Sequence, residues 1–110
     1  MRYKLLTPIE FDGVKVEVIN LDFESLSGAD IVDIDRQFLS GPGIQGGTLY
    51  KELYKEYQAL VAAAASKHPV DLFLKLKAAD FNAVSFRVQR FLLDGDLVGA
   101  EETEQASGEQ

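Results

Sequence analysis

Apolar and polar residues alternate near the start of the chain, with the period of a β-strand that buries one face. The alternation is clearest in Val14–Val18, and a second apolar run precedes it at 2–6. Asp12-Gly13 lies between the two runs, and glycine supplies the positive φ that a tight hairpin connection requires. The sequence therefore predicts a β-hairpin within residues 1–21.

Beyond Ser27 the apolar residues recur every three or four positions, which is the period of an amphipathic helix. Ser27 can cap this helix, since Asp30 follows three positions later, as in a capping box. The helix is expected to end near Ser40. The next segment, 41–47, includes four glycines and a proline, which are too many helix breakers for a regular element. It is predicted to form a loop.

Three further helices are predicted after this loop. Thr48 can cap the second helix, which should stop at His68 because Pro69 disfavours helical geometry in the residue before it. Pro69 then suits the first turn of a short third helix. A fourth helix is expected over Ala78–Leu93, with Asp80 in its first turn, where an acid interacts favourably with the helix dipole.

These elements predict an α+β fold in one domain. The domain is expected to span 1–93, with the hairpin in 1–21 and the helical part in 27–93. A hydrophobic content of 46% is sufficient for a single modest core in a chain of 110 residues. Asp94-Gly95-Asp96 should end the last helix, and the remainder is rich in Glu, Gln, Ser and Gly. Residues 94–110 are therefore predicted to be an acidic, disordered tail.

The charge of the chain is concentrated in this tail. The whole sequence carries a formal charge of −7, but six acids and no base lie in 94–110, so residues 1–93 are nearly neutral. Such a chain is not expected to bind nucleic acid, which requires clustered Lys and Arg. The sequence has no cysteine and no apolar stretch of about 20 residues that would span a membrane. A cytoplasmic protein is expected.

Candidate sites for catalysis or ligand binding are incomplete. The segment 41–48 has the glycine spacing of a phosphate-binding loop, but Gly47 occupies the position of the lysine that would contact the phosphates. His68 is the only histidine, and its place at a helix end favours an interaction with the terminal carbonyl groups over catalysis. The sequence therefore predicts no catalytic residue, cofactor or metal.

Three aspartates near the start of the first helix, Asp30, Asp33 and Asp35, are the remaining candidate for a cation site. Steps of about 100° per residue turn Asp35 away from the other two. Their spacing is not that of a calcium-binding loop. A solvated helix face is the favoured interpretation.

The predicted fourth helix has two apolar faces. The wider stripe is the expected core face and contains Phe81, Val84, Val88, Phe91 and Leu92. Phe86 and Leu93 fall on another side, joined by Ala79 and Ala83. A helix with two apolar faces either lies deep in a core or presents one face to a partner, and the sequence leaves both open. The candidate protein-binding residues are Phe86, Leu93, Ala79 and Ala83.

Four segments carry a resemblance to a known family. They are Leu5–Gly13 in the hairpin, Leu26–Ile31 at the first helix, and Ala79–Val84 leading to Phe91–Leu93 in the fourth. The sequence resembles the phage tail assembly chaperones, and more closely the small tail assembly proteins of Mu-like and related long-tailed phages and prophages. The resemblance covers Tyr3–Leu93, and its motifs are structural, so it transfers no catalytic residue.

The resemblance implies a protein that binds the phage tape measure protein, with tail tube subunits as a further partner, and keeps the tape measure soluble during tail assembly. It also implies a location in the host cytoplasm and absence from the finished virion. The face with Phe86 and Leu93 would suit a client helix or a second copy of the chain. Two alternatives stay open, a structural tail protein such as a terminator or connector and an acidic inhibitor directed against the host. An enzyme is the least favoured class.

Overall fold

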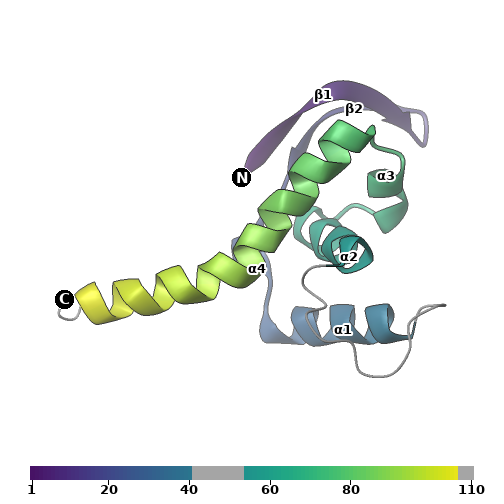
Figure 1. Ribbon diagram of the computed structural model, residues 1–110. Helices are drawn as coiled ribbons and strands as arrows, with labels where there is room; N and C mark the ends of the chain where they lie inside the picture. Colours follow the sequence, from purple (N-terminus) through teal and green to yellow (C-terminus); the bar gives the residue numbers. More distant parts are fainter. Residues whose placement is uncertain (41–53, 107–110) are drawn as a thin grey trace.

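The computed structural model describes residues 1–40 and 54–106, and it describes the side chains of the last helix as far as Leu93. The elements in chain order are β1 (Arg2–Phe11), β2 (Val14–Asn20), a 3-10 turn η1 (Phe23–Ser25), α1 (Gly28–Leu39), α2 (Lys55–Ser66), α3 (Val70–Leu74) and α4 (Ala78–Ala106). In this described part, an antiparallel hairpin followed by four helices confirms the predicted α+β fold (Figure 1).

The hairpin turns at Asp12-Gly13, as the sequence predicts. The two residues have φ angles of 53° and 77°. A pair of residues with positive φ matches the right-handed twist of the flanking strands. The turn therefore fixes the register at the end of the hairpin.

The middle of β1 does not pair regularly with β2. Lys4 pairs with Val18 and Ile9 pairs with Val16, so four residues of β1 lie opposite one residue of β2. Extra residues in one strand are left without partners in the ladder. This long bulge makes backbone N–H groups of β1 available to another element.

The start of α1 is the predicted capping box. The hydroxyl of Ser27 accepts a hydrogen bond from the Asp30 N–H (3.2 Å), and the Asp30 carboxylate accepts one from the Ser27 N–H (2.9 Å). The helix ends at Leu39, next to the predicted end at Ser40. The predicted loop and Thr48 itself lie outside the described residues. The prediction that Thr48 caps the second helix is wrong, because α2 begins at Lys55 and its N-cap is Tyr54, which has an extended backbone.

α2 ends earlier than predicted, at Ser66 and not at His68. Lys67 adopts the left-handed conformation with a φ of 61°, and its N–H donates a hydrogen bond to the Ala63 carbonyl. This geometry closes a helix. Pro69 is then the N-cap of α3. The left-handed residue and the proline together separate the two helices.

α4 is longer than predicted. The sequence predicts an end at Leu93, but the helix continues to Ala106 and extends away from the rest of the protein (Figure 1). Asp94-Gly95-Asp96 contains no proline, and one glycine inside a helix costs only about 1 kcal/mol relative to alanine. Alanine, glutamate and glutamine follow, and these residues favour helices. The predicted helix end is therefore wrong, while the extent of the folded domain stays a prediction.

The core lies between the hairpin and the helices, with α2 in contact with α1, α3 and α4. Its least exposed hydrophobic side chains are Ile19, Leu21, Tyr57, Val61, Ala62, Leu72, Phe73 and Val88. The predicted core face of α4 is confirmed: Val84 and Val88 are buried, and the other three residues of the stripe are half-buried. One of these, Phe91, stacks on Phe23 of η1 with 4.7 Å between ring centroids.

Candidate protein-binding surface

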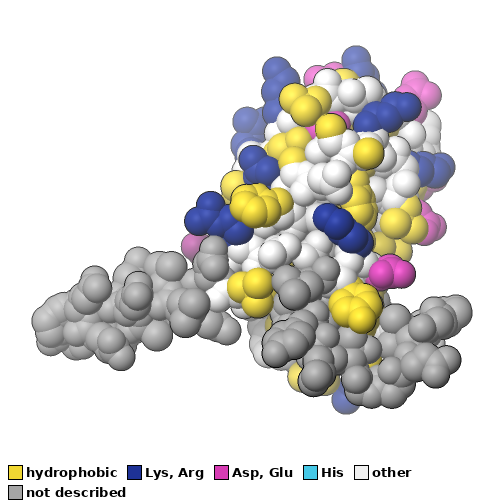
Figure 2. All heavy atoms as spheres, viewed as in Figure 1, with side chains coloured by type: hydrophobic (Ala, Val, Ile, Leu, Met, Phe, Trp, Pro, Cys, Tyr) yellow, Lys and Arg dark blue, Asp and Glu magenta, His cyan; other side chains and the backbone are white. Residues whose placement is uncertain are grey.

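The second apolar face of α4 is exposed in the single chain. Phe86 is 57% exposed and Leu93 is 39% exposed, although full burial of such a side chain is worth about 2 kcal/mol. Ala79 is also exposed and Ala83 is half-buried. Figure 2 shows apolar side chains interspersed with Lys and Arg on the side where α4 lies in front. Of the two possibilities that the sequence leaves open, exposure is the observed one for Phe86 and Leu93, while Ala83 packs against the core.

We call this surface the outer face of α4 and define it by Ala79, Ala83, Phe86 and Leu93. Phe86 and Leu93 are seven positions apart in the chain, which places them about 10 Å apart along the helix axis. Arg90 is exposed, and helical geometry places it on the same stripe between them. The outer face therefore combines two large apolar groups with a positive charge.

The opposite side of α4 is held to the hairpin by a buried carboxylate. Asp80 has no exposed surface, and it accepts hydrogen bonds from the Tyr3 hydroxyl (2.7 Å), the Leu6 N–H (2.9 Å) and the Thr7 N–H (3.0 Å). Leu6 and Thr7 lie in the bulge of β1. The acid that the sequence places in a helix first turn thus satisfies the N–H groups that the bulge leaves unpaired in the sheet.

Hydrogen bonding keeps this carboxylate ionised. Burial alone raises the pKa of Asp80, but hydrogen bonds from the Leu6 N–H, the Tyr3 hydroxyl and the Thr7 N–H outweigh burial and lower the pKa below its usual value. The pKa of Tyr3 is raised by burial, by its hydrogen bond to Asp80 and by the negative charge of Asp80. The pair therefore consists of a charged acceptor and a neutral donor, which is the stronger kind of hydrogen bond.

Arg87 lies against the same cluster. The carbon of its guanidinium group is 4.7 Å from the centre of the Tyr3 ring, within the range of a cation–π interaction. Its Nη1 donates a hydrogen bond to the Ala83 carbonyl (3.0 Å). The positive charge opposes the rise in the pKa of Tyr3. Arg87 thus connects the inner side of α4 to the hairpin.

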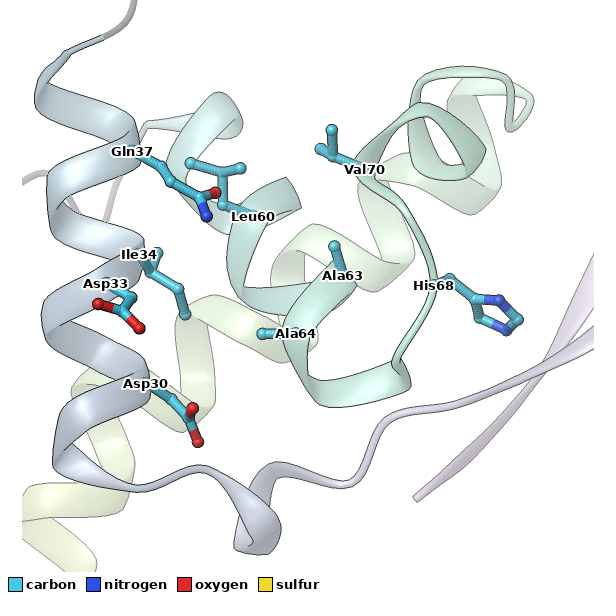
Figure 3. A pocket seen from close by; sticks show the side chains of 9 residues that line it. All are labelled: Asp30, Asp33, Ile34, Gln37, Leu60, Ala63, Ala64, His68 and Val70. Atoms are coloured by element: carbon cyan, nitrogen blue, oxygen red, sulfur yellow. The ribbon is translucent and has the colours of Figure 1, made fainter.

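A groove of about 370 Å³ lies between α1 and α2 (Figure 3). Its lining residues are Asp30, Asp33, Ile34, Gln37, Leu60, Ala63, Ala64, His68 and Val70. The aspartates come from α1, while α2 supplies small and apolar side chains. The wall on α1 is thus acidic and the wall on α2 is apolar. The sequence shows the residues of each wall but carries no signal that the two helices lie side by side.

The three aspartates of α1 separate as predicted. Asp30 and Asp33 line the groove, whereas Asp35 accepts a hydrogen bond from the Tyr57 hydroxyl (2.7 Å). The His68 ring points away from α1 (Figure 3). Within 1–40 and 54–93, no three His, Asp or Glu side chains are placed so that they could hold a metal ion. The segment that resembles a phosphate-binding loop lies outside the described residues.

Comparisons with known proteins identify the family. No curated protein and no solved structure matches the chain. None of the helices in the described part is long and apolar enough to span a membrane. A family model described as phage tail assembly chaperone proteins, E, or 41 or 14, matches residues 2–93. The match begins with β1 and ends at Leu93 of the outer face. The chain therefore belongs to the phage tail assembly chaperone family, as its resemblance to that family predicts.

Proposed function

We propose that this protein binds the tape measure protein of its phage and keeps the apolar helices of that protein soluble while the tail is assembled. Family membership gives the role in tail assembly. The observation that carries the binding role is the exposure of Phe86 and Leu93 on the outer face of α4. Tail tube subunits are a further proposed partner, met when the tape measure is handed over for assembly.

The outer face has the spacing of a helix-binding surface. Amphipathic helices are recognised through anchors one and two turns apart, and Phe86 and Leu93 are seven positions apart. Aromatic residues in such positions often contribute most of the binding energy. Ala79 and Ala83 next to them are small, so a partner helix can approach the backbone closely. The six acids in 94–110 add solubility, because complexes that each carry this negative charge repel one another.

The test is co-expression of the full chain with the tape measure protein from the same phage, followed by affinity purification and measurement of the soluble tape measure. The double variant Phe86→Ser/Leu93→Ser should lower complex affinity at least about tenfold. Its matched control is Val32→Ser/Leu74→Ser, which replaces two exposed apolar residues of α1 and α3 and should leave recovery unchanged.

Each other outcome has a definite meaning. If the unaltered chain neither solubilises nor co-purifies with the tape measure, the proposed function is wrong. If both double variants behave alike, the outer face is not the binding site.

The chaperone is also proposed to act in the host cytoplasm and to leave before the virion is complete. Stoichiometric amounts of the chain in purified particles would favour a structural tail protein, and sedimentation of the chain alone reports any homodimer formed through the same face.

A further inference from the structure

We infer that the groove between α1 and α2 is a second docking site, which binds a short amphipathic helix whose apolar stripe is flanked by Lys or Arg. The identity of this helix as part of the client rests on the proposed function. The groove itself is argued from its apolar wall, its acidic wall and its size, which are independent of the outer face of α4.

The apolar wall suits a helix that lies close to α2. Ala63 and Ala64 are half-buried and line the groove beside Leu60 and Ile34. Alanine at these positions leaves space into which the side chains of another helix can insert. The volume of about 370 Å³ is at the small end of the range for ligand pockets, about 300–1,000 Å³. It therefore holds a few side chains, with the partner's backbone above the groove.

The acidic wall selects the charge of the partner. Asp30 and Asp33 lie one turn apart on the groove side of α1. Asp33 has an ion pair with Arg36 at 3.4 Å, in which both side chains are mostly exposed. Exposed pairs of this kind contribute only about 0–1 kcal/mol, so an incoming Lys or Arg can compete with Arg36. The Asp30 carboxylate accepts a hydrogen bond from the Ser27 N–H, which fixes its position on this wall.

The wall extends far enough for a short helix. From Asp30 to Gln37 the lining residues of α1 cover about 10 Å of helix axis, which matches about two turns of a partner helix. A second copy of this chain is a less suitable occupant, because Asp94 and Asp96 directly follow the outer face of its α4 and would be repelled by the acidic wall; pairing of two chains is one outcome of the test. The segment 94–110 is equally unsuitable because it contains six acids and no base. A Lys-flanked helix from another protein is the occupant that the charges favour.

The experiment titrates the full ¹⁵N-labelled chain with a synthetic helical peptide of about 18 residues. The peptide carries a Leu/Ala stripe flanked by Lys, and a matched peptide carries Glu in place of Lys. The Lys peptide should shift the amide signals of Asp33, Ala63 and Ala64 and should bind at least about tenfold more tightly than the Glu peptide at low salt. This preference should weaken as salt is added.

Two variants localise the site. Asp33→Lys should reduce affinity for the Lys peptide about tenfold, and Ala64→Gln should reduce the affinity for both peptides by filling the groove. The control Asp71→Lys reverses an exposed charge on α3, outside the groove, and should leave binding unchanged. Circular dichroism confirms that each variant remains folded.

Several results would overturn the inference: equal binding of the two peptides, no binding of either, shifts centred on Phe86, or peptide-independent pairing of two chains through the groove. None of these results depends on the tape measure protein. Conversely, failure of the unaltered chain to solubilise the tape measure would reject the proposed function even if the Lys peptide occupied the groove. With the tape measure as ligand, loss of complex for Asp33→Lys but not for Asp71→Lys would show that both sites serve the same client.

Discussion

The two faces of α4 differ in how far their side chains are buried and hydrogen-bonded within the protein. On the inner face, defined by the buried residues Asp80, Val84 and Val88, Val88 has no exposed surface and Asp80 accepts three hydrogen bonds from the hairpin. On the outer face, Phe86 is mostly exposed although it is a larger apolar group than Val88. The inner face of α4 therefore stabilises the fold, whereas the outer face keeps apolar surface that a partner could bury. Substitutions on the outer face are therefore expected to leave the protein folded, whereas substitutions on the inner face are expected to destabilise it.

The largest effect is expected from Asp80→Ala. The substitution leaves the buried Tyr3 hydroxyl without an acceptor and forces the Leu6 and Thr7 N–H groups to find water. Hydrogen bonds to a charged group are worth about 1.5–3 kcal/mol each, but two of these donors lie in exposed residues. We expect the free energy of unfolding in water, measured by urea denaturation, to fall by about 3–4 kcal/mol.

Two control variants separate the loss of the hydrogen bonds to Asp80 from the loss of the helix-dipole interaction that any first-turn acid makes. Asp71→Ala removes an exposed first-turn acid from α3 and should cost less than about 1 kcal/mol. Asp80→Asn keeps one acceptor oxygen and should lie between the two. If Asp80→Ala were no more destabilising than Asp71→Ala, the connection between the bulge and α4 would carry no stability, and the contrast between the two faces would be lost.

Replacing one apolar residue on each face of α4 by alanine compares the contributions of the two faces to stability directly. Val88→Ala opens a cavity in the core and should lower the free energy of unfolding by about 2 kcal/mol. Phe86→Ala removes a larger side chain but should cost less than about 0.5 kcal/mol, since that side chain is already mostly solvated. Urea denaturation of both variants measures the difference. Equal losses would show that the outer face belongs to the core of the protein or of an oligomer.

The features that were predictable from sequence are those encoded by neighbouring residues. The turn at Asp12-Gly13 and the capping box at Ser27 follow from the backbone chemistry of a few adjacent residues. The two faces of α4 follow from its period of 3.6 residues, which places Val88 and Phe86 on different sides. Local chemistry is thus sufficient for the fold class and for the division of α4 into two apolar faces, whereas the sequence leaves open whether the second face is buried or exposed.

Features that depend on contacts between distant residues were not predictable. Asp80 binds groups 73 to 77 positions away in the chain, and no local pattern distinguishes it from an ordinary first-turn acid. The groove arises because α1 and α2 lie side by side, which neither helix specifies alone. The predicted end of α4 at Leu93 is wrong because two aspartates and one glycine do not stop a helix when neighbouring alanine and glutamate favour its continuation.

The smallest effect concerns the charge of Asp80 alone. Its pKa is lowered in the folded protein, so the stability that its ionised form contributes is fully present above the unfolded pKa of about 3.9. Below that pH the unfolded chain takes up a proton before the folded chain does, and the contribution is lost as the pH falls through the folded pKa. The difference in unfolding free energy between the unaltered protein and Asp80→Asn should therefore be constant near neutral pH and shrink below about pH 4. The corresponding difference for Phe86→Ala should not change with pH, because no titrating group of the inner face is involved. A pH-independent difference for Asp80→Asn, measured by urea denaturation across this range, would mean that geometry and not charge makes the inner face stable.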